Sequence, residues 1–392
     1  MGLRVLLLNW RDTAHPETGG AEKYLVEIAE GLAARGHDII FRTAAYPGAL
    51  HEETVNGVHY IRRGGRLTIY PVALMAQLAR RDRADVVVDV QNGVPYLTPL
   101  VRRGPVVNLV HHVHREQWDV LFPRHLARAG WWLESHLAPH VYRSRRYVAV
   151  SGSTRKELGQ LGVADARVDI VHNGTDVPPV EVAGRTDNPS LIVLGRLVPQ
   201  KRVEMAIEAT ATLLEEFPTL TLTVAGSGWW EPHLRALVAQ LGLEEVVHFT
   251  GHVSEEEKHR LLSQTWVHAL PSLKEGWGLV IVEAASHGTP TVAFAEAGGT
   301  GDAIVDGRTG LLSQDGVEPF TAALAELLRD GDRRTAMGAA AKEWAARFTW
   351  SAAVDAWEEI LTEAAASQSS ADGTRNRPLR RRGRSASGPG GH

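Results

Sequence analysis

The sequence predicts an α/β protein made of two doubly wound, Rossmann-like domains that face each other across a central cleft. Apolar runs rich in Val, Ile and Leu alternate with amphipathic helical stretches, which is typical of a parallel sheet covered by helices on both faces. This alternation stops at a polar, Pro-rich segment near the middle of the chain and then starts again. The length of 392 residues also fits two or three domains.

The first half of the chain contains six apolar runs that we expect to be strands. An amphipathic helix over residues 21–35, ending at Gly36, follows the first of them. Since ligands of open α/β sheets bind at the carboxyl ends of the strands, we expect functional residues in the strand-to-helix turns. The predicted strands span residues 3–8, 38–43, 86–90, 106–110, 147–150 and 168–171.

The second half repeats this pattern after a linker at residues 177–190. We assign residues 1–178 to the N-terminal domain and 179–348 to the C-terminal domain. The tail at residues 367–392 is rich in Ser, Gly and Arg and has no period, so we expect it to be disordered. In the second domain the predicted strands span 191–194, 220–225, 246–249, 267–270 and 291–294, and the predicted helices span 203–217, 230–241, 255–263 and 279–287.

Composition excludes several classes of protein. The chain has no cysteine, which excludes disulfides and thiolate metal sites. It has no apolar run of the roughly 18 residues that span a membrane, and its first apolar run is too short for a signal peptide, so we expect a cytoplasmic protein. Arginines cluster in the first half, which indicates either a solvated surface or an anionic partner such as a phosphorylated lipid acceptor or a membrane surface.

Two turns are candidate phosphate sites, one because it contains glycines and the other because it contains cationic side chains. Gly19 and Gly20 stand just before the helix that begins near Ala21, where free N–H groups and the helix dipole favour an anion. Arg196 and Lys201 follow a strand and flank a helix start, which suits a diphosphate. The alternative for Gly19 and Gly20 is an ordinary strand-to-helix turn, and the alternative for Arg196 and Lys201 is a pair of surface cations. The glycine spacing of the first turn does not fit a nicotinamide-binding site.

Three histidines follow the predicted strand 106–110. His111, His112 and His114 lie at its carboxyl end, where a histidine can hydrogen-bond a polar substrate or simply be structural. No acidic or cysteine ligand stands nearby at a convincing spacing, so we do not predict a metal site there. Similarly, Gly226 and Gly228 form a tight turn that fits close packing as well as ligand contact.

The most informative stretch is KEGWGLVIVEAASHGTP, residues 274–290. It places Glu275 on a turn flanked by Gly276 and Gly278, and Glu283 one turn inside the helix that follows. Carboxylates accept hydrogen bonds from neighbouring hydroxyls, so the pair suits a sugar and a ribose.

These residues resemble a known family. EGWGLVIVEAASHGTP looks like the E-x7-E signature of retaining, nucleotide-sugar-dependent glycosyltransferases of family 4, which have the two-domain GT-B fold. GGAE at 19–22, HNGTD at 172–176 and GRLVPQKR at 195–202 agree with it. The resemblance also implies that a helix at 349–366 crosses back onto the N-terminal domain.

The resemblance implies roles for individual residues. Arg196 and Lys201 would neutralise the leaving diphosphate, Glu275 would hold sugar hydroxyls near the anomeric carbon, and Glu283 would bind the ribose. His111 is the first choice for the active-site histidine and His114 the second. The implied catalytic residues are Glu275, His111, His114, Arg196 and Lys201, and the implied donor-binding residues are Gly19, Gly20, Asn173, Arg196, Lys201, Gly251, Val253, Glu275, Trp277, Gly278, Leu279 and Glu283.

Two departures from the family pattern concern the C-terminal domain. Trp229 and Trp230 replace a small turn with proline, which affects the expected contacts with the nucleotide base, and Asp302 stands where a glutamate is usual.

The resemblance implies transfer of a hexose from a nucleoside diphosphate sugar, UDP rather than GDP, to a hydroxyl of a glycan, lipid or small molecule, with no metal cofactor and no nucleic acid partner. Trp118, Trp131 and Trp132 are either core residues or part of a peripheral contact with the inner face of a membrane. The alternatives are a nucleotide-sugar 2-epimerase of the same fold and a non-catalytic binding partner.

Overall fold

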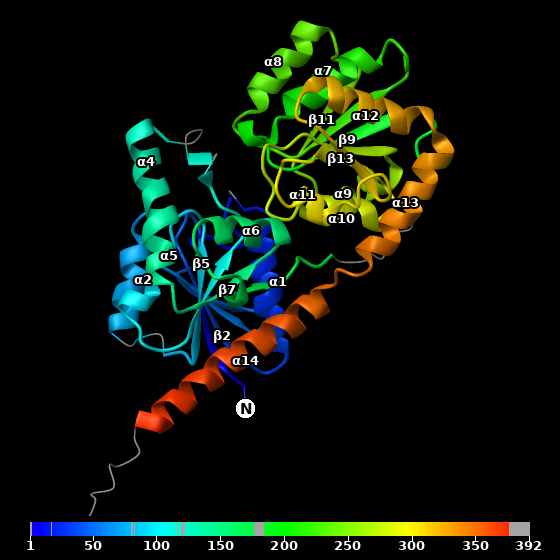
Figure 1. The fold of residues 1–392 in the computed structure, drawn as a ribbon. Helices are drawn as coiled ribbons and strands as arrows, with labels where there is room; N and C mark the ends of the chain where they lie inside the picture. Colours follow the sequence, from blue (N-terminus) through cyan, green and yellow to red (C-terminus); the bar gives the residue numbers. More distant parts are fainter. Residues whose placement is uncertain are drawn as a thin grey trace, which may run out of the picture.

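The computed structural model confirms two α/β domains, each with its own sheet (Figure 1). It describes residues 2–16, 18–79, 81, 83–115, 117–118, 122–175 and 184–375. Within these residues no helix has the length and apolar character needed to cross a membrane.

The N-terminal domain contains an eight-stranded sheet of order β3-β4-β2-β1-β5-β6-β7-β8. Its strand pairs are parallel except for the antiparallel pair β3–β4. The strands are β1 Arg4–Leu8, β2 Asp38–Thr43, β3 Glu52–Val55, β4 Val58–Arg62, β5 Val86–Gln91, β6 Val106–Val110, β7 Arg146–Ala149 and β8 Val168–Ile170. The helices are α1 Gly20–Ala34, α2 Ile69–Leu78, α4 Arg124–Trp132, a π-helical turn at Leu133–Leu137, α5 Ala138–Val141 and α6 Gly152–Gln160, with 3₁₀ turns at Thr98–Leu100 and Asp165–Arg167.

The C-terminal domain contains a six-stranded, fully parallel sheet of order β11-β10-β9-β12-β13-β14. Its strands are β9 Ser190–Leu194, β10 Thr221–Ala225, β11 Val247–Gly251, β12 Val267–Leu270, β13 Thr291–Phe294 and β14 Gly310–Ser313. The helices are α7 Val203–Leu213, α8 Glu231–Leu241, α9 Glu255–Gln264, α10 Leu279–Ser286, α11 Thr300–Ala303, α12 Val317–Arg329 and α13 Gly331–Ala345, with a 3₁₀ turn at Pro199–Lys201.

Alternation of side chains along β1 explains why helices cover both faces of the first sheet. Val5 and Leu7 belong to the buried cluster that includes residues of α1, whereas Leu6 and Leu8 belong to a second cluster on the opposite face. Because both faces are apolar, the strand reads as a continuous apolar run in the sequence.

The hairpin β3–β4 was not predicted, although the sequence contains a signal for it. Asn56 and Gly57 connect the strands and have φ angles of 49° and 81°. A two-residue loop with positive φ at both positions is the favoured hairpin turn, and Asn-Gly is its strongest sequence signal.

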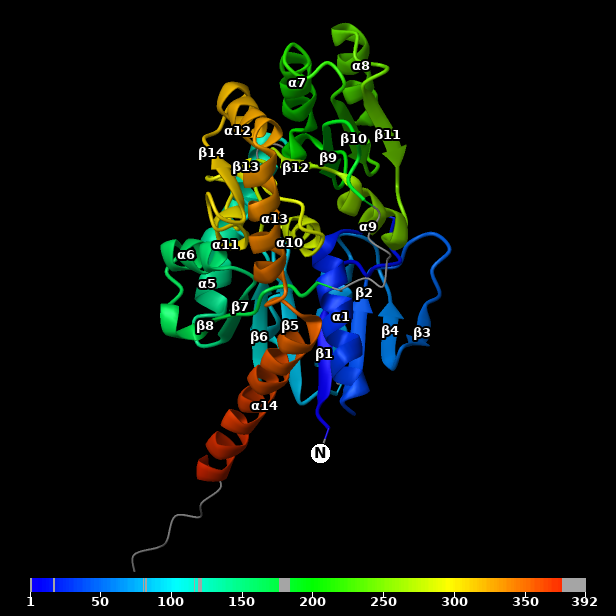
Figure 2. The same ribbon diagram turned by 90° about the vertical axis from the view of Figure 1, so that its right-hand side faces the viewer.

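The helix expected at 349–366 is longer in the structure, where α14 spans Trp350–Arg375. Residues 367–375, which we expected to be disordered, are therefore helical, because the Ala-rich run before them favours a helix and no proline interrupts it before residue 378. The rest of the expected tail, residues 376–392, lies outside the described residues. Figure 2 shows α14 running along the N-terminal domain beside α1.

Two crossings between the domains lie side by side. Thr175 follows the N-terminal sheet and Thr349 precedes α14, and the two residues form a parallel bridge in which the N–H of Thr175 donates to the carbonyl oxygen of Phe348 at 2.9 Å. The predicted domain boundary, between residues 178 and 179, lies outside the described residues.

Candidate functional site

The N-termini of α1 and α10, one from each domain, meet at the candidate donor site. A Cβ at Gly19 would lie 3.5 Å from Nε of Arg196, and a Cβ at Gly20 would lie 3.8 Å from the side chain of Leu279. Larger side chains in the Gly19–Gly20 turn would therefore fill the space beside Arg196. The structure thus brings Gly19, Gly20, Arg196 and Leu279 together, at the carboxyl ends of β1 and β9 and in front of two helix N-termini.

Lys201, which follows Arg196 in the same turn, and Glu275, which lies in the loop before Leu279, form an ion pair. Nζ of Lys201 donates to Oε1 of Glu275 at 2.5 Å, and both side chains are mostly buried. The backbone of Glu275 is fixed as well, since its N–H donates to Ala297 and its carbonyl oxygen accepts from Gly299. Arg196 is exposed, and no carboxylate pairs with it in the part of the chain that the structure describes.

The glycines around Glu275 have separate structural reasons. A Cβ at Gly276 would lie 2.4 Å from the carbonyl oxygen of His111, so only glycine lets this loop pass so close to the N-terminal domain. Gly278 has a φ of +82°, which glycine adopts without strain, and directly precedes α10. The ring of Trp277 is buried and stacks on His172 with 4.2 Å between ring centroids, so only its backbone is available to a ligand.

His111 is buried beside Tyr24, whose ring meets it edge-on at a centroid distance of 5.4 Å. Nε2 of His111 has no hydrogen-bond partner among the described residues. Burial, together with the nearby charge of His114, lowers the pKa of His111 to about 3. The imidazole is therefore neutral near pH 7 and can act as a hydrogen-bonding group rather than as a cation.

His114 has different surroundings. Its Nδ1 and its backbone N–H both lie near Oε1 of the buried Glu134, at 3.1 and 3.0 Å. Oε2 of Glu134 accepts from the indole of Trp118 at 2.7 Å, and the ring of His114 packs on that of His112. Glu134 therefore ties His114 and Trp118 together, which is a structural role for both.

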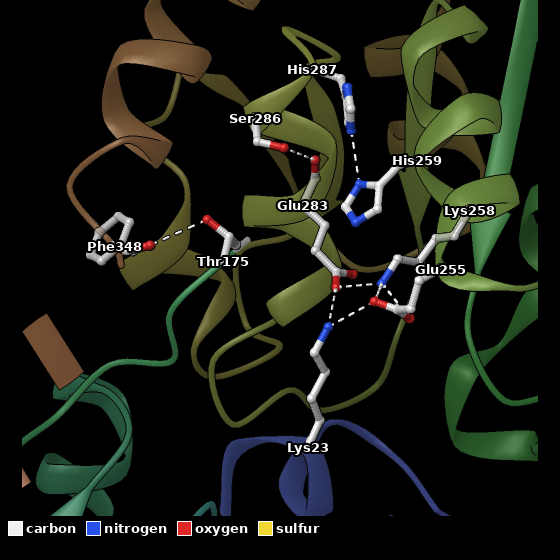
Figure 3. A network of polar contacts seen from close by, with 9 residues as sticks. All are labelled: Lys23, Thr175, Glu255, Lys258, His259, Glu283, Ser286, His287 and Phe348. Carbon is white, nitrogen blue, oxygen red and sulfur yellow. Dashed lines mark hydrogen bonds and ion pairs between the residues drawn. The ribbon is translucent and has the colours of Figure 1, made fainter. Parts of the chain in front are cut away.

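Glu283 lies in a network of charges drawn from both domains (Figure 3). Its Oε1 accepts from Nζ of Lys258 at 2.7 Å and lies 3.9 Å from Nζ of Lys23 in α1. Both lysines also bind Glu255, each at 2.8 Å to Oε2. Burial raises the pKa of Glu255, but the hydrogen bonds from Lys23 and Lys258 outweigh it and lower that pKa to about 2. Sequence reasoning missed Lys23, Glu255 and Lys258, and no local pattern marks them.

The other predicted donor residues show no contact with Lys201 or Glu275 within the described residues, and each has its own surroundings. Oδ1 of the buried Asn173 has no hydrogen-bond partner among the described residues. Gly251, with a φ of +70°, ends β11, and Val253 packs on the cluster that contains Leu262 and Ala284. The turn of Gly226 and Gly228 is explained by packing, since a Cβ at either residue would lie 1.8 or 2.1 Å from the carbonyl oxygen of Gly195 or Leu197.

Further contacts join the domains beside the site. Asp302, at the position of the expected glutamate, accepts from the N–H of Ser153 at 2.9 Å, near the N-terminus of α6. Lys274 forms an ion pair with Glu157, also in α6. These contacts hold the 274–278 loop and α11 against the N-terminal domain.

Two family models together match most of the chain. One, described as "Glycosyltransferase Family 4", matches residues 18–177, and the other, "Glycosyl transferases group 1", matches residues 180–344. A D-inositol 3-phosphate glycosyltransferase of Streptomyces scabiei is 30% identical over 397 residues, covering 89% of this chain and 87% of the relative. A GDP-mannose-dependent α-(1-6)-phosphatidylinositol monomannoside mannosyltransferase of Mycolicibacterium smegmatis is 27% identical over 362 residues, covering 84% and 91%.

Solved structures share the fold over nearly the whole chain. Sucrose-phosphate synthase from Thermosynechococcus elongatus superposes with a TM-score of 0.79 at 20% identity, covering 93% of this chain and 99% of that one. An Anabaena protein solved in complex with UDP and glucose superposes with a TM-score of 0.71 at 19% identity, covering 92% and 100%.

Proposed function

Since this chain belongs to the family 4 glycosyltransferases of the GT-B fold, we propose that it transfers a hexose from a nucleoside diphosphate sugar to an acceptor hydroxyl with retention of the anomeric configuration. The observation that supports this most directly is the Lys201–Glu275 pair beside Arg196 and the two helix N-termini. A donor needs cationic and N–H groups for its diphosphate and a carboxylate for its sugar hydroxyls, and these groups lie together here.

In the proposed mechanism the diphosphate is the leaving group. Arg196, Lys201 and the N-termini of α1 and α10 stabilise the negative charge that grows on it, as preorganised electrostatic groups do. Glu275 holds sugar hydroxyls through the carboxylate that Lys201 orients. The acceptor hydroxyl attacks from the face that the diphosphate leaves, and its proton passes to a phosphate oxygen, so no separate strong base is required.

His111 acts in this scheme as a neutral group. Its free Nε2 and its low pKa suit a hydrogen bond to the sugar or the acceptor rather than an ionic contact. The contact of its carbonyl oxygen with Gly276 couples its position to the loop that carries Glu275.

For the donor we propose UDP as the nucleotide, with GDP as the competing choice. The name of one relative specifies GDP-mannose, whereas a structural neighbour was solved with UDP and glucose. Trp229, which is 65% exposed on the loop before α8, offers a surface for a base.

For the acceptor we propose a phosphorylated molecule bound by the N-terminal domain. Two basic side chains there, Arg11 and Arg66, lie over the ring of Trp10, and Arg11 follows β1 at the carboxyl edge of the sheet. The names of both relatives contain an inositol phosphate group, which is a phosphorylated molecule of the kind proposed here as the acceptor. Trp132 on α4 is 54% exposed and gives a lipid-linked acceptor an apolar surface to meet.

A thermal-shift screen tests the donor proposal. UDP, GDP, ADP and their sugar conjugates are added without and then with EDTA, since a ligand that binds only the folded state raises the melting temperature. We expect a shift with UDP or a UDP-sugar that EDTA does not change, in agreement with a site that needs no metal cofactor. A shift that EDTA abolishes would contradict the metal-free site. In an activity assay without acceptor, formation of product would favour the epimerase.

A further inference from the structure

Glu283 is a nearly buried carboxylate that needs a cationic partner. Its side chain is 5% exposed, and it lies on α10, one turn after the helix N-terminus at the donor site. An ionised carboxylate in such a place is stable only when paired and hydrogen-bonded. Lys258 on α9 is the partner, at 2.7 Å from Oε1.

The ammonium group of Lys258 uses its donors on three carboxylate oxygens. It donates to Oε1 of Glu283 and to Oε1 and Oε2 of Glu255, the latter two at 2.9 and 2.8 Å. Because the Lys258 side chain is only 10% exposed, little freedom remains for its ammonium group. Lys258 therefore fixes where Oε1 of Glu283 lies.

The two oxygens of Glu283 differ in their surroundings. Lys258 and Lys23 both approach Oε1, and within the described residues no donor is recorded on Oε2 (Figure 3). A carboxylate oxygen can accept more than one hydrogen bond. The arrangement thus holds one oxygen and leaves the other to accept from a ligand.

We propose that Lys258 is a positioning residue for donor recognition, which holds Oε1 of Glu283 so that Oε2 accepts a hydrogen bond from a ribose hydroxyl of the nucleotide. This inference rests on the proposed function, in which Glu283 faces the ribose. It assigns Lys258 to specificity for ribonucleotides, beyond a role in joining α9 to α10.

The test measures the dissociation constants of UDP, 2′-deoxy-UDP and 3′-deoxy-UDP by titration calorimetry, with the guanosine series used instead where the thermal-shift screen selects GDP. For the unchanged protein we expect a loss of about 10- to 100-fold when the hydroxyl bound by Glu283 is missing, because a buried carboxylate then loses its partner. Glu283→Gln should weaken binding of the ribonucleotide and reduce this discrimination.

Lys258→Met is the decisive variant. We expect it to weaken binding of the ribonucleotide about 10-fold and to leave binding of the discriminated deoxynucleotide nearly unchanged, so that the two affinities converge. Lys258→Arg keeps the charge but replaces a compact ammonium group by a planar guanidinium group, so we expect it to retain part of the discrimination between ribo- and deoxynucleotide. If the Lys258→Met protein does not fold, Lys258→Arg is the test variant. Arg260→Met removes an exposed cation from the same helix and should change neither affinity.

Equal weakening of ribo- and deoxynucleotide binding by either Lys258 variant would overturn the inference, because Lys258 would then only support the fold of the site. Unchanged binding in both Lys258 variants would overturn it as well. If the unchanged protein binds neither UDP nor GDP, the proposed function fails and this inference fails with it. If the unchanged protein binds one of them and the Lys258 variants give either result above, only this inference fails.

Discussion

At the scale of single residues, the Lys201–Glu275 pair is the centre of the proposed chemistry. Lys201→Ala removes the cation that we propose for the leaving diphosphate, and Glu275→Ala removes the carboxylate that we propose for the sugar hydroxyls; each change also breaks the ion pair between them. We expect each change to lower turnover by about 10²- to 10³-fold, the range found when one preorganised electrostatic group is lost. The measurements are steady-state turnover and the melting temperature.

The matched control for these variants is Lys156→Ala, which removes an exposed lysine from α6. We expect its turnover to match that of the unchanged protein. Near-normal turnover in both Lys201→Ala and Glu275→Ala would remove this pair from the mechanism.

His111 leads to a prediction about pH. Its pKa is lowered to about 3, so it stays neutral from pH 5 to pH 8 and its titration should not appear in the pH profile of kcat/KM. His111→Gln keeps a hydrogen-bonding side chain, and we expect it to lower kcat/KM by about 10- to 100-fold at every pH, with a profile parallel to that of the unchanged protein. An inflection near pH 6.5 that disappears in His111→Gln would show that His111 acts as an acid or base instead.

At the scale of elements, the buried strand β12 carries a histidine that we expect to make the C-terminal domain sensitive to acid. His268 is fully buried in it and its Nδ1 lies 3.0 Å from Oγ1 of Thr291. Burial, with a smaller effect of the charge of Lys201, lowers its pKa to about 3. Since the folded pKa is below the unfolded one, we expect this histidine to destabilise the fold as pH falls from about 6.5 towards 3.

We predict that His268→Gln loses less stability in acid than the unchanged protein. Its free energy of unfolding should fall by about 2 kcal/mol less between pH 7 and pH 4.5, because the glutamine cannot take up a proton. Urea unfolding at several pH values measures this difference. His248→Gln on β11 is the control, since His248 is exposed, and an equal acid response of the two variants would exclude His268 as the cause.

The elements that the sequence predicted correctly are those with a strong local signal. Strands 38–43, 106–110, 267–270 and 291–294 have the observed bounds, because a largely buried strand is dominated by apolar residues even where a polar residue interrupts it. Short elements such as α11 and β14 were not predicted. Four residues carry too little periodicity to separate a strand or a helix turn from a loop.

At the scale of the whole molecule, α14 joins the C-terminal end of the described chain to the N-terminal domain. The indole N–H of the buried Trp357 donates to the hydroxyl of Tyr24 at 2.6 Å, and that hydroxyl donates to the carbonyl oxygen of Val171 at 3.1 Å. Arg35 adds exposed ion pairs to Asp355 and Glu358. Exposed pairs contribute little to stability, so Trp357 should dominate the attachment.

We predict that Trp357→Ala destabilises the protein by about 3 to 5 kcal/mol, the cost of removing a large buried aromatic side chain. Trp357→Phe keeps a ring but loses the hydrogen bond and some volume, and about 1 to 2 kcal/mol is expected. Urea unfolding followed by circular dichroism measures both. Trp132→Phe, at an exposed site, is the control and should change the stability by less than about 0.5 kcal/mol. A stable Trp357→Ala protein would mean that α14 is held by other contacts.

The candidate site was only partly accessible to sequence reasoning. Glu275, Glu283, Arg196 and Lys201 could be named because glycine-flanked turns and a family signature surround them. Lys258 could not be named, because a lysine three residues after a glutamate on a helix is a common surface pattern. Its burial against Glu283 follows from how α9 packs on α10.

The sequence by itself determined the two α/β units, most of their strands, the turns before α1 and α10, and the family. These features depend on periodicity and on residues close together in the chain. Only the tertiary structure decided which charges meet, as Lys23 and Glu255 do although they are 232 residues apart. The physical reason is that long side chains pair according to the relative placement of two domains, and that placement leaves no periodic mark in the sequence.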